Sequence, residues 1–238
     1  MERKHFLKSL LLGAASAPVM LSACSKEADA VTPTSTGGTT GTGTGSCAVA
    51  PTETEGPFPT KAPASYVRSD IRDSKTGYQM AVNITVQNTN ASCAALAGAL
   101  VDIWHCDAEG NYSEYGGTGM QSTNYQNVHF LRGRQTTNAS GVVSFTSVFP
   151  GWYNGRATHI HVHIYSASGT SLKVTQIAFP EGTGSAVAAV NGYTKGLSGY
   201  TANAQDNVFS DGVTQQLATV TGSTTAGFNL AITFSVAA

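Results

Sequence analysis

The segment Thr158-His159-Ile160-His161-Val162-His163-Ile164-Tyr165 alternates polar and apolar side chains along its length. Successive side chains on a β-strand point to opposite faces, so the three histidines share one face and the aliphatic residues share the other. We therefore expect a strand over 157–165 with its aliphatic face in a core. The same period-two pattern recurs in the segments 81–87, 100–105, 141–148, 172–179 and 228–236.

Turn-forming residues separate these segments. Clusters of Gly, Asn, Asp and Ser lie between them, and helical periodicity is nearly absent. One helical turn is expected over 184–190, while 213–220 fits neither period. Several short strands with regular turn signals are typical of a β-sandwich or a barrel, so the sequence predicts an all-β fold with little helix.

Composition excludes several classes of protein. The chain has 238 residues, with 13 Lys and Arg against 14 Asp and Glu, and a formal net charge of −1. Binding to nucleic acid needs a surplus of positive charge, so it is not expected. The hydrophobic content of 41% argues against wholesale disorder, and a single long apolar run argues against a polytopic membrane protein.

That apolar run lies at the amino end, after the basic residues Arg3, Lys4 and Lys8. The run 9–22 is shorter than a bilayer span and is typical of an export signal. It ends in Leu21-Ser22-Ala23-Cys24, which resembles the lipobox of bacterial lipoproteins. The resemblance implies removal of residues 1–23 and a lipid anchor on Cys24, at the periplasmic or the outer face of the cell envelope. The alternative is a cleaved signal beside an incidental cysteine.

A linker and one domain follow. Residues 31–46 read VTPTSTGGTTGTGTGS, a composition that cannot bury a core and is typical of a tether. We therefore divide the chain into a signal segment (1–23), a lipidated linker (24–46) and a β-domain (47–238).

Three cysteines remain after Cys24. Export favours a disulfide, but Cys47, Cys93 and Cys106 are odd in number, so one thiol is left over. Cys47 and Cys93 both stand at the edges of expected elements, which favours that pair, although spacing alone does not decide it. The C-x-x-C pattern of thiolate zinc sites is absent from the sequence.

The histidine strand also suggests a metal site. Imidazoles two residues apart on one strand face can direct their ring nitrogens at one ion, although such a stripe can equally be a solvated face. A tyrosine stands nearby in Pro150-Gly151-Trp152-Tyr153, and Tyr112 follows the expected strand at 100–105. Phenolate is a hard anionic donor that suits Fe(III), whereas zinc sites use Cys, His and carboxylates. Two alternatives stay open: the tyrosines are ordinary half-buried aromatics, or all three histidines hold copper or zinc.

Several ordered motifs together resemble the intradiol ring-cleavage dioxygenases, the family of protocatechuate 3,4-dioxygenase and catechol 1,2-dioxygenase. The motifs begin at Thr54-Glu55-Gly56-Pro57-Phe58 and continue in the segments 101–112, 130–135, 141–145, 150–153 and 156–161. The resemblance covers nearly all of 47–238 and implies a β-sandwich of two mixed sheets.

The resemblance also implies roles for individual residues. Four of them match the ligands of a non-haem Fe(III) ion: Tyr112, Tyr153, His159 and His161. Arg156 matches an arginine beside the substrate ring, and Gln176 matches a glutamine near the reactive carbon. Positions that line the substrate pocket are matched by Thr54, Pro57 and Phe58.

The implied reaction is cleavage of a catechol ring by O₂ between its two hydroxyl-bearing carbons, which gives a cis,cis-muconate. The metal-bound Tyr153 phenolate would leave on substrate binding and accept a proton. No external reductant is required, since the substrate supplies all four electrons. The runner-up function is an inactive β-sandwich lipoprotein that binds a protein partner, or carbohydrate on Trp104, Trp152 and Tyr153.

The substrate and the oligomeric state stay open at this point. A catechol that carries an acidic group requires a cation in its binding pocket. The candidates for that cation are Arg68, Arg72, Arg132 and Arg134, each of which can equally be a surface charge.

Overall fold

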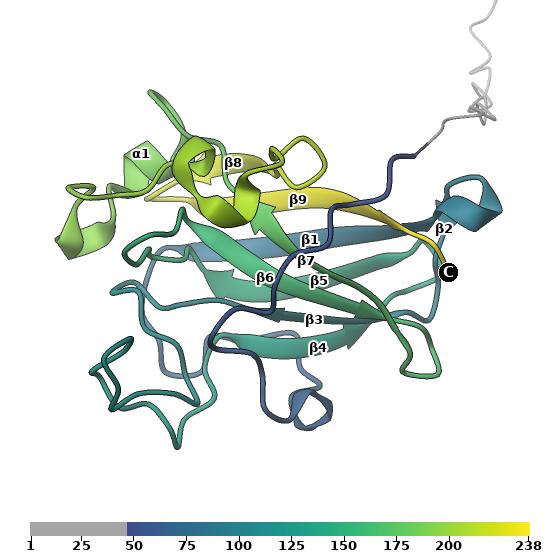
Figure 1. The fold of residues 1–238 in the computed structure, drawn as a ribbon, viewed down its shortest axis with the longest axis horizontal. Helices are drawn as coiled ribbons and strands as arrows, with labels where there is room; N and C mark the ends of the chain where they lie inside the picture. Colours follow the sequence, from purple (N-terminus) through teal and green to yellow (C-terminus); the bar gives the residue numbers. More distant parts are fainter. Residues whose placement is uncertain (1–46) are drawn as a thin grey trace, which may run out of the picture. The chain divides into compact units, whose positions relative to one another are not determined.

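The computed structural model describes residues 47–238 (Figure 1). The expected signal segment, Cys24 and the linker lie outside these residues. The described chain forms two sheets, whose strands are β1 (Gln79–Asn88), β2 (Ala94–Ala95), β3 (Leu100–Trp104), β4 (Arg132–Thr136), β5 (Val142–Val148), β6 (His159–Tyr165), β7 (Ser171–Ala178), β8 (Thr219–Ser223) and β9 (Gly227–Val236).

The first sheet has five strands and mixed pairing. Its order is β2-β1-β9-β8, and β5 also pairs with β1. The long pairing of β1 with β9 is parallel, and the other pairings are antiparallel. The parallel pair joins strands from opposite ends of the domain.

The second sheet has the order β4-β3-β6-β7. The pairings among its four strands are antiparallel, and isolated parallel bridges join its edge strands to Val67 and Leu217, so it is mixed only at those bridges. Its register sets Trp104 and Gln176 opposite His161, on either side of β6. We call it the site sheet, because it carries the histidines.

The two sheets share one core, as the all-β prediction required. Alternate residues of β1 and β9 are buried, and their apolar side chains form one cluster with those of the site sheet. Ile160, Val162 and Ile164 of β6 are fully buried in that cluster. The all-β fold that the alternation predicted is therefore confirmed, and so is the two-sheet β-sandwich that the family resemblance implied.

The histidine face of β6 is covered as well. Residues 53–58, which we call the strap, cross over β7 and β6 (Figure 1). The amide of Glu53 donates to the carbonyl of Val174 at 2.9 Å. Gly56 has φ +69°, and a Cβ there would lie 3.0 Å from Cε1 of His161, so a side chain would strain this close approach. The strap turns a solvent-facing sheet surface into an enclosed one.

Helical structure is short. One α-helix, α1 (Ala186–Val190), begins after Ser185, whose hydroxyl accepts from the amide of Ala188. It lies where the single turn was expected. The 3-10 turns are η1 (Pro63–Ser65), η2 (Thr89–Ala91), η3 (Tyr193–Lys195), η4 (Asn203–Gln205) and η5 (Asn207–Phe209). Within 47–238, every helix is too short to cross a membrane.

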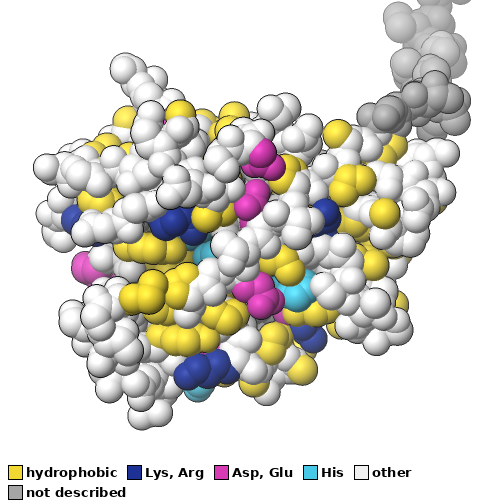
Figure 2. Space-filling model, viewed as in Figure 1, with side chains coloured by type: hydrophobic (Ala, Val, Ile, Leu, Met, Phe, Trp, Pro, Cys, Tyr) yellow, Lys and Arg dark blue, Asp and Glu magenta, His cyan; other side chains and the backbone are white. Residues whose placement is uncertain are grey.

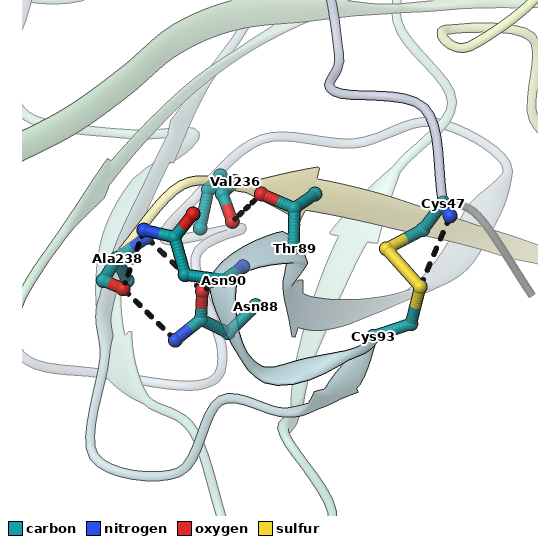
Figure 3. Close-up of a disulfide and its surroundings, with 7 residues drawn as sticks. All are labelled: Cys47, Asn88, Thr89, Asn90, Cys93, Val236 and Ala238. Carbon is teal, nitrogen blue, oxygen red and sulfur yellow. Dashed lines mark hydrogen bonds between the residues drawn. A yellow bond between two sulfur atoms is a disulfide. The ribbon is translucent and has the colours of Figure 1, made fainter. Parts of the chain in front are cut away.

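A disulfide joins Cys47, just before the strap, to Cys93 in the turn between β1 and β2 (Figure 3). The Cα atoms are 5.8 Å apart. This is the pair that the sequence analysis favoured. The third cysteine, Cys106, is a buried thiol whose pKa is raised by burial, so it stays protonated.

Candidate active site

Loops and strands bring the four expected ligand residues to one place above the site sheet. His159 and His161 lie on β6 and share its outer face. Tyr112 comes from the loop after β3, and Tyr153 from the loop between β5 and β6. The phenol oxygen of Tyr112 lies 3.1 Å from Nε2 of His159. Nε2 of His159 in turn lies 3.2 Å from Nε2 of His161. The fourth ring, Tyr153, lies edge-on to Tyr112 at 5.8 Å and to His159 at 5.6 Å between centroids.

The histidines are set up as neutral donors of a nitrogen lone pair. Nδ1 of His159 lies 2.6 Å from the carbonyl oxygen of Ala157, which can only accept, so Nδ1 carries the proton. Nε2 is therefore left with a free lone pair. Burial lowers the pKa of both histidines well below the ordinary value, and the positive charge of Arg156 adds to the effect. The ring of His161 is held flat against the indole of Trp104, at 4.9 Å between centroids.

The two phenols differ in their surroundings. Burial raises the pKa of Tyr112 well above 10, and the neighbouring Tyr153 raises it further. Burial also raises the pKa of Tyr153, but the guanidinium of Arg156 opposes that rise. Arg156 lowers the pKa of Tyr112 as well, so the difference that remains is that Tyr112 is fully enclosed and Tyr153 is only partly buried.

The donor set fits one metal ion. Two donors on one ion, each at about 2.1 Å, lie about 3.0–3.4 Å apart for bond angles between 90° and 109°. The contacts of 3.1 Å and 3.2 Å fall in that range. Two imidazole lone pairs and two phenols suit a hard ion of high charge better than zinc.

The three-histidine alternative is not supported. His163 lies on the same face of β6, but its ring nitrogens contact Oε1 of Glu55 at 3.0 Å and Oγ of Ser171 at 2.7 Å. Across residues 47–238, no three His, Cys, Asp or Glu side chains are grouped so that they could hold a metal. The copper or zinc site built from three histidines is therefore wrong.

Arg156 is held over the ligand cluster by a carboxylate that the sequence analysis missed. Its Nε donates to both oxygens of Asp206 at 2.9 Å. Nη1 lies 3.5 Å from the phenol oxygen of Tyr153 and 3.4 Å from Nε2 of His159. Asp206 is buried and also accepts from the amides of Ala157 and Val208. Only the fold brings Asp206, fifty residues away in sequence, to Arg156, so no local pattern indicated it.

Gln176 connects Arg156 to the strap. Its Oε1 accepts a hydrogen bond from Nη2 of Arg156, and its Nε2 donates to the carbonyl of Thr54 at 2.9 Å. The hydroxyl of Thr54 accepts from the amide of Gly56, so this side chain shapes the strap. Gln176 thereby fixes the guanidinium relative to the cover of the site.

The remaining strap residues face different ways. Phe58 is buried, stacks on Tyr112 at 4.8 Å and meets Tyr153 edge-on at 6.4 Å between centroids. Pro57 is exposed beside it. Phe58 therefore forms one wall of the site, whereas Pro57 is not among the residues that line the pocket.

A pocket of about 450 Å³ opens beside the ligand cluster. Figure 2 shows a hollow on the face drawn, with hydrophobic side chains around it and basic and histidine side chains within it. The residues that line the pocket are Phe58, Glu109, Gly110, Asn111, Gly119, Met120, Gln121, Ser122, Tyr153, Asn154 and Lys195. Its volume lies in the range of small-molecule sites, about 300–1,000 Å³.

A family model described as "Dioxygenase" matches residues 55–214, which include all four candidate ligands and Arg156. The chain belongs to the intradiol ring-cleavage dioxygenase family. A curated chlorocatechol 1,2-dioxygenase from Rhodococcus opacus is 28% identical over 46% of this chain and 46% of its own length. The chain thus spans about half the length of the curated relative that it matches.

Solved structures agree with this family assignment. An intradiol ring-cleavage dioxygenase from Tetranychus urticae is 26% identical, with a TM-score of 0.69 over 80% of this chain and 95% of that one. The dioxygenase domain of a carbohydrate-binding fusion protein from Streptomyces is 24% identical, with a TM-score of 0.57 over 80% and 99% of the two chains. At that identity the second likeness shows the fold alone.

The buried tryptophans do not suit carbohydrate binding. Trp104 and Trp152 are each only 2% exposed, and an aromatic platform for sugar needs an open ring face. Trp104 stacks on His161, and Trp152 is covered by Tyr200 and Lys195. The sugar-platform interpretation of these two residues is wrong.

The four arginines suggested as partners of an acidic substrate contact other parts of the protein and not the pocket. Arg68 pairs with Asp73, Arg72 with Asp70, and Arg134 with Asp102. Arg132 is fully buried, where it donates to the carbonyls of Phe58 and Ser113 and lies 3.5 Å from the carboxylate of Glu114. All four are absent from the lining of the pocket.

Proposed function

We propose that this protein is a non-haem Fe(III) enzyme that cleaves a catechol ring with O₂ and releases a cis,cis-muconate-type product. The observation that carries the proposal is the buried convergence of two neutral imidazoles with two phenols beside a fixed guanidinium. Membership of the family supports a dioxygenase. The chlorocatechol activity named for the Rhodococcus relative supports a catechol-type substrate.

The ligand residues have distinct tasks in this proposal. Tyr112, His159 and His161 are fully enclosed, so they suit permanent ligands. Tyr153 is only partly buried and borders the pocket. It suits the ligand that gives way to substrate, and its phenolate oxygen then takes a proton from a catechol hydroxyl. Bound Fe(III) would lower the pKa of the catechol hydroxyls and draw electron density from the ring, which makes a ring carbon reactive toward O₂.

Arg156 supplies a fixed positive charge to the ring. Because Asp206 and Gln176 hold the guanidinium, it needs no reorganisation when negative charge develops on the substrate. Phe58 and the strap exclude water from the inner side of the site. The reaction breaks the bond between the two hydroxyl-bearing carbons, and both atoms of O₂ enter the product.

Metal analysis with a visible spectrum and an oxygen electrode tests this proposal. We expect about one iron per chain, a red-brown colour from charge transfer between tyrosinate and Fe(III), and oxygen uptake with at least one catechol. Tyr112→Phe and Tyr153→Phe should each weaken the colour. The matched control is Tyr115→Phe, which removes only a hydroxyl bonded to the carbonyl of Pro59. A colourless, iron-free protein without oxygen uptake on any catechol would refute the proposal.

We also propose that the enzyme works outside the cytoplasm, anchored through a lipid on Cys24. The lipobox-like segment before that residue supports the anchor, and the disulfide between Cys47 and Cys93 supports an oxidising compartment. Labelling with radioactive palmitate in a bacterial host tests the anchor. We expect label in the wild type and none in Cys24→Ala, whereas label in both proteins contradicts the assignment.

A further inference from the structure

The pocket beside Tyr153 carries one basic and one acidic side chain. Among its lining residues, all of them within 47–238, Lys195 is the only Lys or Arg and Glu109 is the only Asp or Glu. The two side chains form no ion pair with each other in the described chain, since no nitrogen–oxygen contact within 4.0 Å joins them. The pocket therefore offers a substrate an ammonium group that no carboxylate neutralises directly.

The ammonium of Lys195 is held in a defined position. Nζ donates to the carbonyl of Trp152 at 3.0 Å and lies 3.8 Å from the centroid of the Trp152 ring. The indole is itself fixed, because its Nε1 donates to the carbonyl of Gly196 at 2.9 Å. Trp152 directly precedes Tyr153. Lys195 is thus tied to the backbone beside the residue that we propose to give way to substrate.

Lys195 keeps capacity for a ligand. An ammonium has three N–H donors, and the carbonyl of Trp152 takes one of them. The side chain is exposed and borders the pocket, so the others can reach an anion there. A carboxylate suits this position, because a charge-assisted hydrogen bond is stronger than a neutral one.

The size of the pocket favours more than a bare ring. A volume of about 450 Å³ exceeds what one six-membered ring fills. Phe58 and Tyr153, which both contact Tyr112 of the ligand cluster, share the lining of this pocket with Lys195 and Asn154. A ligand in the pocket can therefore meet the cluster with its ring and Lys195 with a substituent.

We propose that Lys195 determines substrate specificity by binding a carboxylate on the side chain of the catechol ring. The preferred substrate class is then a catechol that carries a short acidic side chain. This inference rests on the proposed ring-cleavage function. Glu109 opposes it by repelling the same carboxylate, so the two residues set the preference with opposite signs.

The test compares two ligands that differ only in charge. We suggest 3,4-dihydroxyphenylpropanoate and its primary amide, with unsubstituted catechol as reference. Oxygen uptake gives kcat/KM for each, and calorimetry gives the dissociation constants under anaerobic conditions. The proteins are wild type, Lys195→Gln, Lys195→Arg and Glu109→Gln. Met120→Leu, which changes an uncharged residue of the same lining, is the control.

We expect wild type to prefer the acid to the amide by about tenfold, and we expect added salt to reduce that preference. Lys195→Gln should abolish it, Lys195→Arg should keep it and Glu109→Gln should increase it. Activity on unsubstituted catechol should stay within about threefold in each variant.

An unchanged ratio of acid to amide in Lys195→Gln, with catechol still cleaved, overturns this inference and leaves the proposed function standing. A wild type that cleaves none of the three compounds and binds none of them contradicts the proposed function itself. A preference that Met120→Leu alters as much as Lys195→Gln also overturns the role of Lys195.

Discussion

The two sheets carry the same alternation but use their outer faces differently. On β9 of the five-stranded sheet, alternate residues such as Asn229, Ala231 and Thr233 are exposed. On β6 of the site sheet, residues 159–164 are buried on both faces, because the strap and the neighbouring loops cover the second face. The polar residues under that cover are the candidate ligands His159 and His161, together with His163, which contacts Glu55 and Ser171. Polar alternation in a strand thus marks a functional face only where other parts of the chain enclose it.

The largest effect is expected from a substitution on β6, where we compare two histidines that lie on the same face of the strand. His161→Ala removes a candidate ligand and should lower iron affinity and kcat/KM by more than about 100-fold, the upper range found for residues that merely support a ligand. His163→Ala is the matched control, because His163 contacts Glu55 and Ser171. Iron content and oxygen uptake are measured for both. Equal losses of iron and oxygen uptake in the two variants would contradict the assignment of His161, and not His163, as a ligand.

A second prediction concerns the disulfide that ties the chain just before the strap to the five-stranded sheet. That stretch is held by the bond between Cys47 and Cys93, and the amide of Ala50 donates to the carbonyl of Ser235 on β9. The cysteines are 46 residues apart, so replacing both by Ser should lower the free energy of unfolding by about 4 kcal/mol. Urea denaturation measures the change. An unaltered midpoint would mean that the strap does not depend on this bond.

A third prediction concerns pH and a contact between the sheets. His105, directly after β3, is buried, and its Nε2 lies 2.7 Å from Oγ of Ser147 on β5. Burial lowers the pKa of His105 to about 4. Below pH 6.5, His105 is therefore protonated in the unfolded chain but stays neutral in the folded chain. The free energy of unfolding consequently falls as the pH drops from about 6.5 to about 4.

The loss from this group amounts to about 3 kcal/mol, from 1.36 kcal/mol per pKa unit. In His105→Gln, the free energy of unfolding should fall less steeply with pH between pH 4 and pH 6.5, by the slope that corresponds to about one bound proton. Denaturation series at several pH values measure that slope. An identical slope in wild type and variant would contradict the buried neutral state of His105.

A smaller effect is expected from the carboxylate behind Arg156. Asp206→Asn removes the charge that holds the guanidinium and should lower kcat/KM by about 10- to 100-fold, the usual effect of losing a group that orients a catalytic residue. Iron content should be retained, because Asp206 contacts no candidate ligand. Asp211→Asn, at an exposed site, is the control. Loss of iron together with activity would assign Asp206 to the metal site instead.

The smallest effect is expected on the open face of β9. Thr233→Ala should change the free energy of unfolding by less than about 0.5 kcal/mol, because the side chain is exposed. Oxygen uptake should be unchanged. A large loss of stability there would show that the outer face of the five-stranded sheet is also covered, against the comparison drawn above.

Sequence reasoning identified the strands whose burial alternates. The segments expected at 81–87 and 228–236 correspond to β1 and β9, with bounds that differ by one or two residues. It missed β8, whose sequence Thr-Val-Thr-Gly-Ser has little apolar alternation, and β2, which has two residues. Such short edge strands depend on their partner strand more than on their own pattern.

Some residues of the candidate site could likewise be predicted from the sequence, and others could not. The two histidines were visible because one strand carries both, and the tyrosines because of the motifs around them. Asp206 and Lys195 were not visible, since each acts on a residue more than 40 positions away and lies in or beside a short 3-10 turn without apolar periodicity. The cover over His161 also depends on a contact that only the fold creates. A single sequence thus does not reveal which distant residues contact the site.

The position of the strap in the chain has a consequence for assembly. Thr54 pairs with Gln176 across 122 residues, and Glu55 contacts His163 across 108. Contacts of such high sequence separation form late, since a long loop must close first. The part of the domain that is synthesised first therefore completes the site only after β6 and β7 exist. Until then the face that bears the histidines stays open, and under the proposed function an ion would reach the candidate ligands before the strap covers them.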